Sequence, residues 1–450
     1  MSTDTIVAIA TPQGRGGIGI VRLSGMLVNQ IAVVLLKQLP QPRTVYWGNF
    51  YDEQGAVLDR GIALYFPAPH SFTGESIIEL HAHGSPVVLD LLMAVTLRLG
   101  ARLARPGEFT ERAFLNGKLD LTQAEAIADL IASSTVTQAK LAQRTLQGAL
   151  SKQVNVLLKQ LIELRVQLEV CLDFSDEDLD FINHTDIDNQ LNQLMSAMQT
   201  LLDCAQQGEL MRDGISVVIA GPPNAGKSSL LNTLSGQDTA IVTPIPGTTR
   251  DLLRTEIALD GMPVRLIDTA GLHSNSNDPI EQEGMRRARV EIEQADRVLW
   301  VIDATTDIDN SECNQNLQQF SSSIPVTIIH NKIDLMNQLP FVREQSGYTT
   351  IGLSAKTGIG IELLQQHLKH SVNYRDLADN AFLARRRHLE ALRQTQVQLQ
   401  SAAQAQQQNA PIEYVAEELR LAQVALGQIT GVFRSDDLLN VIFADFCIGK

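Results

Sequence analysis

A glycine-rich segment in the second half of the chain carries the pattern GxxxxGK[ST], as Gly221-Pro-Pro-Asn-Ala-Gly-Lys-Ser228. It follows the apolar run 217–220 and precedes a helical pattern that starts at Ser229, which is the strand–loop–helix context that the motif requires. Its glycines allow backbone N–H groups to face a phosphate at the amino end of a helix. Lys227 is therefore expected to reach the β- and γ-phosphates of a nucleotide, and Ser228 to hold Mg²⁺.

Further short motifs follow this loop in order, each at the end of a predicted strand. Asp268-Thr-Ala-Gly271 would contact Mg²⁺ through a water and sense the γ-phosphate through the last N–H. Asn331-Lys-Ile-Asp334 would read the base. The Asp334 carboxylate can accept hydrogen bonds from N1–H and the N2 amine of guanine, and adenine offers neither.

Ser354-Ala-Lys356 would support the base, and Thr248 and Thr249 lie where a switch threonine belongs. These motifs in this order predict a GTPase domain that resembles the Ras-like, translation-factor-related class. The predicted nucleotide contacts are Asn224, Ala225, Gly226, Lys227, Ser228, Ser229, Thr243, Pro244, Ile245, Pro246, Gly247, Thr248, Thr249, Asp268, Thr269, Ala270, Gly271, Asn331, Lys332, Ile333, Asp334, Ser354, Ala355 and Lys356.

Two positions depart from the Ras pattern. Ras places a glutamine after Asp-x-x-Gly to orient the attacking water, and this chain has Leu272 there. Glu281 or Glu283 could act instead through a water; the alternative is that both lie on a solvated helix start. Asn224, inside the loop, could hold a monovalent cation with carbonyl groups near residues 243–247. Such a cation would neutralise charge between the β- and γ-phosphates in place of an arginine finger. The alternative is that Asn224 only braces the loop.

Strands and helices alternate from 215 to about 370. The expected strands are 215–220, 254–259, 263–268, 297–303, 325–331 and 348–353, with a tight hairpin at Asp260-Gly261. They predict a mostly parallel sheet with one antiparallel strand. Helical patterns lie on both sides, the first opened by a capping box at Thr122–Glu125 and interrupted by an acidic loop at 173–180.

The first 118 residues are predicted to be α+β, with strands near 5–10, 19–23, 61–66 and 76–81 and helices near 25–39 and 86–100. The expected organisation is an N-terminal domain at 1–118, a helical domain at 119–213 and 374–450, and the GTPase domain at 214–373 inserted into it. The length of 450 residues suits about three domains.

Composition excludes several classes of protein. The net charge of −15 argues against a protein that coats nucleic acid through bulk positive charge. Four scattered cysteines, the lack of a leader pattern and the lack of a run of 18 apolar residues predict a cytoplasmic protein without a membrane span. Gly14–Gly19 matches GxGxxG, but a strand pattern follows it, so a dinucleotide site is rejected. His81 and His83 lack a third metal ligand and are expected to be structural.

The chain resembles the MnmE (TrmE) family of tRNA-modification GTPases over its whole length. The residues that carry this resemblance are Asn224 in the phosphate loop, Gly247-Thr-Thr-Arg-Asp251, Asp268-Thr-Ala-Gly-Leu272, Leu115-Asn-Gly-Lys-Leu-Asp-Leu121, Glu79-Leu-His-Ala-His-Gly84 and the terminal Cys447-Ile-Gly-Lys450. Pro222 stands where the family commonly has arginine, at a variable position of the motif, so little effect is expected.

The resemblance implies a potassium-activated GTPase that forms a homodimer through an N-terminal folate-binding-like domain. It also implies a heterotetramer with MnmG, a partner that uses FAD and NADH. Together they would install an aminomethyl or carboxymethylaminomethyl group at C5 of the wobble uridine (U34) of certain tRNAs, using (6S)-5-formyl-tetrahydrofolate or a related tetrahydrofolate. The residues matched to family roles are Arg22, Glu79, Lys118 and Lys450 for folate, Asn224, Thr243, Ile245 and Thr248 for potassium, Ser228 and Thr249 for Mg²⁺, Glu281 as general base and Cys447 as a further functional position.

The sequence leaves other interpretations of the function open. The chain could be a regulatory GTPase of ribosome assembly, but it shows no basic RNA-binding domain with a GxxG loop. A folate-dependent aminomethyltransferase with an incidental GTPase would not explain the insertion. Cys447 could be a small apolar residue near the end of a helix rather than a reactive thiol. Arg385–Arg387 is expected to form a solvated helix face, with tRNA contact as the alternative.

Overall fold

The computed structural model describes residues 4–173, 184–237, 254–268, 295–306, 324–345, 347–375 and 381–432, together with Ile442, Phe446 and Gly449. The chain divides into two compact units. The first comprises Met1–Ala128, Thr145–Ser196 and Ala391–Lys450, and the second comprises Asp129–Arg144 and Ala197–Glu390. The domain boundaries expected near residues 118, 213 and 373 stay predictions.

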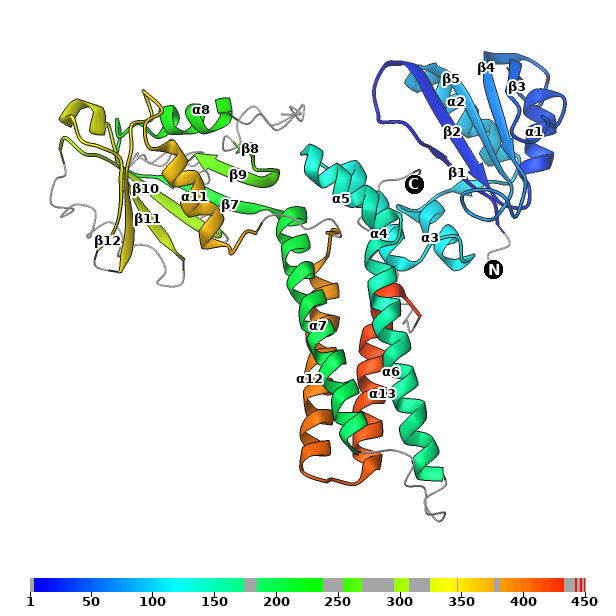
Figure 1. Ribbon diagram of the computed structural model, residues 1–450. Helices are drawn as coiled ribbons and strands as arrows, with labels where there is room; N and C mark the ends of the chain where they lie inside the picture. Colours follow the sequence, from blue (N-terminus) through cyan, green and yellow to red (C-terminus); the bar gives the residue numbers. More distant parts are fainter. Residues whose placement is uncertain are drawn as a thin grey trace, which may run out of the picture. The chain divides into compact units, whose positions relative to one another are not determined.

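The N-terminal part of the first unit is built on a six-stranded sheet with the order β3-β4-β5-β2-β1-β6 (Figure 1). Its strands are β1 (Ile6–Ile9), β2 (Gly16–Ser24), β3 (Tyr46–Tyr51), β4 (Val57–Phe66), β5 (Ile77–Gly84) and β6 (Arg102–Leu103), and its helices are α1 (Val28–Leu36), α2 (Pro86–Arg98) and α3 (Glu108–Leu115). Val21 and Leu23 of β2 point into the core beneath α1 and α2, because alternate side chains of a strand face opposite sides. Arg22 therefore lies on the other face.

The sequence did not predict β3 or α3, and there is a physical reason why each was missed. Gly48 and Asn49 interrupt the strand pattern of β3. Helix α3 buries charged side chains, so it lacks the usual apolar stripe. Its Arg112 pairs with Glu108, Glu75 and Asp4 at 2.9–3.0 Å, and these ion pairs fix the helix against the sheet.

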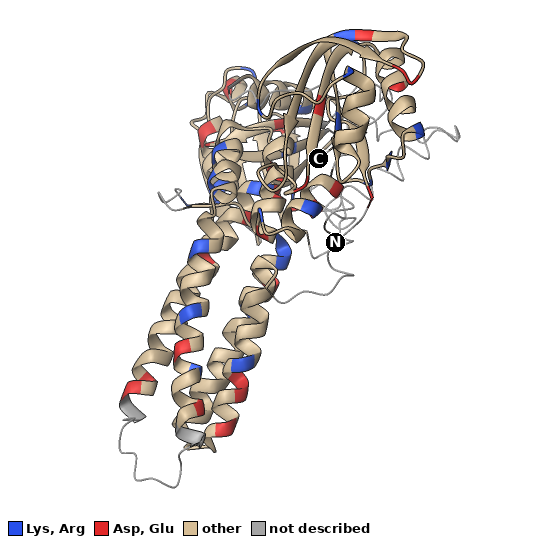
Figure 2. Ribbon diagram, turned by 90° about the vertical axis from the view of Figure 1, so that its right-hand side faces the viewer, with Lys and Arg blue, Asp and Glu red and all other residues tan. Residues whose placement is uncertain are grey.

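Long helices follow in the order α4 (Leu121–Ala132), α5 (Val136–Leu146), α6 (Ala149–Asp173) and α7 (His184–Asp213), and α12 (Arg386–Gln407) and α13 (Ile412–Thr430) follow the α/β sheet. Helices α6 and α13 pack side by side. Figure 2 shows basic and acidic residues interspersed along the long helices. No helix in the described part of the chain is both long and apolar enough to cross a bilayer.

The capping box of α4 lies two residues before the predicted one. Asp120 Oδ1 accepts the N–H of Gln123 at 2.9 Å, and Gln123 Oε1 accepts the N–H of Asp120 at 3.0 Å. The capping box is thus Asp-x-x-Gln, in which each side chain accepts a hydrogen bond from the backbone N–H of the other residue. Thr122 is instead buried in the helix and bonds to Ser151. The predicted Thr122–Glu125 box is therefore wrong in register.

The second unit contains a seven-stranded sheet with the order β12-β13-β11-β10-β7-β9-β8. Its elements are β7 (Ile215–Ala220), α8 (Lys227–Gln237), β8 (Arg254–Leu259), β9 (Met262–Asp268), β10 (Arg297–Asp303), β11 (Val326–Asn331), the 3₁₀ turn η1 (Ile333–Met336), β12 (Phe341–Gln345), β13 (Tyr348–Gly352) and α11 (Ile361–Ser371). The six predicted strands are confirmed, with ends that differ by one residue or less.

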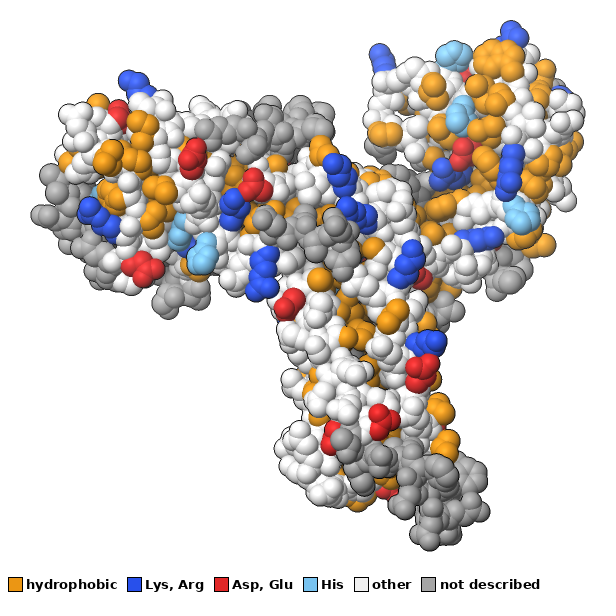
Figure 3. Space-filling model, in the orientation of Figure 1, with side chains coloured by type: hydrophobic (Ala, Val, Ile, Leu, Met, Phe, Trp, Pro, Cys, Tyr) orange, Lys and Arg blue, Asp and Glu red, His pale blue; other side chains and the backbone are white. Residues whose placement is uncertain are grey.

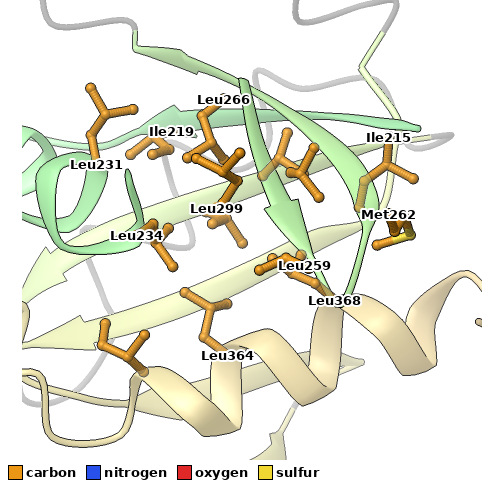
Figure 4. Packing of buried hydrophobic residues seen from close by; sticks show 14 of the residues in the cluster. Ile215, Ile219, Leu231, Leu234, Leu259, Met262, Leu266, Leu299, Leu364 and Leu368 are labelled. Carbon is orange, nitrogen blue, oxygen red and sulfur yellow. The ribbon is translucent and has the colours of Figure 1, made fainter. Parts of the chain in front are cut away.

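The expectation of one antiparallel strand is wrong, because β12 is a second one. It pairs antiparallel with β13, as β8 does with β9, and the other five strands are parallel. Strand β12 lies at the sheet edge, with Val342, Arg343 and Glu344 exposed, so it lacks the buried apolar run of the parallel strands. Figure 4 shows the core of this unit, where Leu231 and Leu234 of α8 and Leu364 and Leu368 of α11 pack on the sheet.

The nearly buried carboxylate of Asp129 forms ion pairs with the segment before the first strand of this α/β sheet and with the segment after its last helix. Asp129 accepts hydrogen bonds from Arg212, before β7, at 2.9 Å and from Arg385, before α12, at 2.7 Å. Its side chain is 8% exposed and that of Arg385 is 14% exposed. The expected solvated face at 385–387 is therefore wrong for Arg385 and fits Arg386, which is 85% exposed.

His367 on α11 makes the stability of this unit sensitive to acid. Burial, with Arg297 and then His370 nearby, lowers the pKa of His367 to about 4. Between this value and about 6.5 the unfolded chain binds a proton that the folded chain rejects, so stability falls as pH falls through this window. We expect a loss of about 1–2 kcal/mol, allowing for partial exposure.

Chemical denaturation of wild type and His367→Gln at pH 7 and pH 4.5 measures this effect. The glutamine variant should lose less stability than wild type on acidification. Equal losses in the two proteins would contradict the assignment.

Candidate functional site

The predicted nucleotide motifs gather at one edge of the α/β sheet. Strands β7 and β11 are parallel neighbours of β10, and β13 is a parallel neighbour of β11. The phosphate loop and Ser354 follow the carboxyl ends of β7 and β13, and Asn331 is the last residue of β11. Open parallel sheets bind ligands at this edge. The fold therefore brings together residues that lie more than a hundred positions apart.

The phosphate loop adopts backbone conformations that explain its glycines. Gly221 has φ 140° and Gly226 has φ 95°, values that side chains with a Cβ rarely adopt. A Cβ on Gly221 would collide with the carbonyl oxygen of Val301, and one on Gly226 would collide with the Asn331 side chain. Asn224, also in the left-handed region at φ 63°, is exposed at the tip of the loop.

Lys227, the first residue of α8, turns back into the loop that precedes it. Its ammonium donates to the carbonyl oxygens of Gly221 and Pro222, both at 2.8 Å, and the residue is only 7% exposed. The positive charge is thus held inside a loop at a helix N-terminus, where a phosphate group would bind. Ser228 and Ser229 are exposed beside it.

Asn331 joins the phosphate loop to the predicted base site. Its Nδ2 donates to Ala225 O at 2.8 Å, and its Oδ1 accepts from the N–H groups of Lys332 and Ala355 at 2.8 and 2.9 Å. The residue is 2% exposed, and both its amide oxygen and its amide nitrogen are bonded within the protein. Asn331 therefore acts as a brace between three loops.

The predicted guanine reader Asp334 carries a buried carboxylate oxygen, Oδ1, that has no hydrogen-bond partner among the described residues. An unpaired buried acceptor is costly unless a ligand supplies the donor. Guanine supplies two such donors, so this oxygen fits the predicted base. Ser354, two residues after β13, is buried, and its Oγ accepts a hydrogen bond from Thr357 N at 3.3 Å, whereas Lys356 is exposed.

Several predicted site residues fall outside the part of the chain that the structure describes. These are Thr243, Pro244, Ile245, Pro246, Gly247, Thr248, Thr249, Thr269, Ala270, Gly271, Glu281, Cys447 and Lys450. The backbone of Asp268 is described and ends β9, beside Ile219 of β7. Asp268 therefore lies at the same sheet edge as the phosphate loop.

A second polar group lies on the face of the N-terminal sheet that is opposite to α1 and α2. Arg22 of β2 is directly opposite Glu79 of β5, and Arg22 Nε donates to Glu79 Oε1 at 2.8 Å. His81, two residues along β5 on the same face, has Nε2 3.4 Å from Glu79 Oε2. The Arg22 guanidinium also lies over the Phe109 ring, 5.8 Å from its centroid. Of the predicted folate contacts, the strand pairing brings Arg22 and Glu79 together.

The carboxyl-terminal segment reaches this group. Arg22 Nη1 donates to Gly449 O at 3.4 Å, and Gly449 lies against the backbone of Ile9 and Ala10. Gly449 has φ 95°, and a Cβ there would collide with Ile9 O, so glycine is required. Lys118 is exposed, in the turn that follows α3.

Sequence reasoning missed His81, Phe109 and Gly449 as neighbours of Arg22. The position of His81 could have been predicted from the sequence, because residues i and i+2 of a strand share a face and Glu79 was a candidate folate contact. His83 points to Asp59 instead, with Nδ1 2.8 Å from Oδ1. Within the described residues, no three His, Cys, Asp or Glu side chains come together as a metal site.

Comparison with known proteins finds similarity over almost the whole chain. Residues 5–118 match the family model described as the GTP-binding protein TrmE N-terminus, and residues 121–447 match the MnmE helical domain. The tRNA modification GTPase MnmE of Hydrogenovibrio crunogenus is 51% identical over 100% of this chain and 99% of its own length. The chain belongs to the MnmE family. The MnmE of Histophilus somni strain 2336 is likewise 51% identical, over 100% of both chains.

Membership of the MnmE family makes the chain a GTP hydrolase that acts in tRNA modification. The predicted fold class, with its α+β N-terminal part, its helices and its Ras-like α/β part, is confirmed as well. Among solved structures, a GTP-binding protein of Sulfolobus solfataricus in complex with GDP is 20% identical, with a TM-score of 0.27, over 48% of this chain and 67% of that chain.

Proposed function

We propose that the chain is a potassium-activated GTPase that works with an FAD-dependent MnmG-type partner on tRNA. Together they install an aminomethyl or carboxymethylaminomethyl group at C5 of the wobble uridine, using a tetrahydrofolate one-carbon unit. The observation that carries this proposal is the occurrence in one MnmE-family chain of two polar sites, the braced phosphate loop with Asp334 and the Arg22–Glu79 pair beside Gly449.

On the nucleotide side, the residues divide the work of positioning and charge stabilisation. Lys227 would bind the β- and γ-phosphates, Ser228 and Thr249 would hold Mg²⁺, and Asp334 would select guanine. The contacts of Lys227 with the loop carbonyls support its part, because they hold its ammonium in place before a nucleotide binds. With leucine at 272, we assign the orientation of the attacking water to Glu281.

Asn224 is assigned to a potassium site, together with Thr243, Ile245 and Thr248. The exposed loop-tip position of Asn224 and its left-handed backbone support this assignment, because they leave its amide oxygen outside the buried network of Asn331. A monovalent cation there would supply positive charge where negative charge develops in the transition state.

We expect Asn224→Ala to hydrolyse GTP at the same rate in potassium and in sodium, about 10-fold or more below wild type in potassium. Phosphate release at fixed ionic strength measures this difference. Lys159→Ala, which removes an exposed lysine of α6 outside the nucleotide site, should keep the potassium stimulation. Persistent stimulation in Asn224→Ala would exclude Asn224 as a ligand.

On the folate side, the carboxylate of Glu79 would accept hydrogen bonds from the N–H donors of a pterin while Arg22 holds it in place. The bond at 2.8 Å from Arg22 leaves lone pairs of Glu79 that can accept, since a carboxylate has about four acceptor sites. We include Lys118, Lys450 and Cys447 in this site. Gly449, which contacts Arg22, stands between the last two in the chain.

Glu79→Gln tests the folate assignment, because glutamine keeps the size and loses the charge. We expect the affinity for 5-formyl-tetrahydrofolate to fall about 10- to 100-fold, with GTP hydrolysis unchanged. Isothermal titration calorimetry measures the folate affinity. Glu53→Gln, which breaks an exposed pair with Arg98, serves as the matched control. Wild type that binds no folate would instead favour a regulatory GTPase without folate chemistry.

The proposed assembly is a homodimer that joins MnmG in a heterotetramer. Figure 3 shows exposed hydrophobic side chains over the N-terminal sheet. On and beside its edge strand β3, Val45, Trp47 and Val57 are 62%, 60% and 56% exposed. Exposed apolar side chains on and beside an edge strand support self-association.

A further inference from the structure

We propose that Asp303 is a positioning residue for the guanine nucleotide, which acts by holding the side chain of Lys332 in place. Asp303 ends β10 and belongs to none of the nucleotide motifs. The inference rests on the proposed nucleotide site, because Lys332 is the second residue of the guanine motif Asn331–Asp334. It adds to that site a residue from the neighbouring strand.

The sheet register places Asp303 beside this motif. Strands β10 and β11 are parallel, and Asp303 is the partner of Asn331. The N–H of Ala304 donates to Asn331 O at 3.0 Å, which fixes the ends of the two strands together. Asp303 therefore lies at the sheet edge where the phosphate loop and the base site meet.

Lys332 has an unusual backbone conformation that directs it to Asp303. Its φ is 67°, in the left-handed region that residues other than glycine rarely adopt. The Asn331 side chain stabilises this conformation by accepting the Lys332 N–H at 2.8 Å. With the backbone turned in this way, Lys332 Nζ lies 2.6 Å from Asp303 Oδ2.

The carboxylate of Asp303 is itself held in one orientation. Its Oδ1 accepts the N–H of Thr305 at 3.0 Å and the hydroxyl of Thr305 at 2.7 Å, so Oδ2 is left for Lys332. Burial raises the pKa of Asp303, but the bonds from Lys332 and Thr305 together outweigh it and hold the pKa below its ordinary value. The group is therefore an anion at neutral pH.

This arrangement is better explained by ligand binding than by stability. A partly exposed ion pair contributes little to folding, and the side chains of Lys332 and Asp303 are 31% and 19% exposed. A free lysine side chain has many rotamers, and a ligand that packs against it must restrict them. With Nζ fixed at Asp303, the methylene stem is already ordered before a nucleotide binds.

A double-mutant cycle on the full chain tests the proposal. We expect Asp303→Ala and Lys332→Met to accelerate dissociation of a fluorescent GDP analogue by about 3- to 10-fold each, because each removes the tether. The double variant should be no faster than the faster single variant. Lys332→Ala should dissociate faster than Lys332→Met, because it also removes the stem. Asp303→Asn, which keeps an acceptor for Lys332, should recover part of the loss.

Asp296→Ala is the matched control, because Asp296 lies just before β10 at its other end and bonds to Ser216. It should dissociate at the wild-type rate. Unchanged or slower dissociation in Asp303→Ala, or rates that multiply in the double variant, would overturn the proposal. Wild type that fails to bind GDP would instead refute the nucleotide site on which it rests.

Discussion

Replacement of Lys227 by alanine should reduce GTP hydrolysis by about 10³-fold or more and weaken GTP binding as well. The ammonium of Lys227 is nearly buried and lies between the carbonyl oxygens of Gly221 and Pro222. Without it these oxygens, which carry partial negative charge, would face the β- and γ-phosphates with no ammonium between them. Binding and transition-state stabilisation would both suffer, because charge builds up on the phosphate oxygens in the reaction.

Phosphate release under single-turnover conditions separates the loss of chemistry from the loss of binding. Lys159→Ala, which removes a lysine of α6 that is 78% exposed, is the matched control and should hydrolyse GTP at the wild-type rate. If Lys227→Ala hydrolysed GTP within a few-fold of wild type, the phosphate loop would not be the catalytic loop.

The second large effect is expected from Asp334→Asn. The buried Oδ1 of Asp334 lacks a donor among the described residues, and guanine would supply one. Asparagine would place an amide N–H against the N–H groups of guanine, or leave one of them unpaired. The affinity for GTP should therefore fall about 100-fold, which corresponds to about 3 kcal/mol.

The same substitution should improve binding of xanthosine triphosphate, whose C2 carbonyl can accept a hydrogen bond from the asparagine. Titration of wild type and Asp334→Asn with both nucleotides measures the exchange of preference. Equal losses for the two nucleotides would show that the substitution damages the site in general. An unchanged GTP affinity would show that Asp334 does not read the base.

Much of the α/β unit could be predicted from the sequence, because its parallel strands are buried on both faces. Runs such as Val217–Ala220 are continuously apolar and end in glycine or a polar motif, so they are visible without any knowledge of their neighbours. Strand β12 was not visible, since an exposed edge strand needs no such run. Helix α3 was missed because ion pairs with Asp4 and Glu75, distant in sequence, stabilise it.

The candidate sites likewise divide into parts that the sequence predicts and parts that it does not. The nucleotide motifs are local, so the sequence identified them residue by residue. The pairing of Arg22 with Glu79 depends on strands 57 residues apart, and only resemblance to a family indicated it in advance. The tether of Lys332 to Asp303 and the bonds of Asp129 with Arg212 and Arg385 arise from the way the chain folds. Contacts of this kind cannot be predicted from the spacing of residues along the sequence.

The central claim is that GTP hydrolysis by this chain drives modification of the wobble uridine. Nucleoside mass spectrometry tests it most directly, on tRNA from cells that lack the gene and carry either wild type or Lys227→Ala. The account predicts loss of the C5-substituted wobble uridine, restored by wild type and not by Lys227→Ala. Unchanged tRNA in the cells that lack the gene, or full restoration by Lys227→Ala, would contradict it.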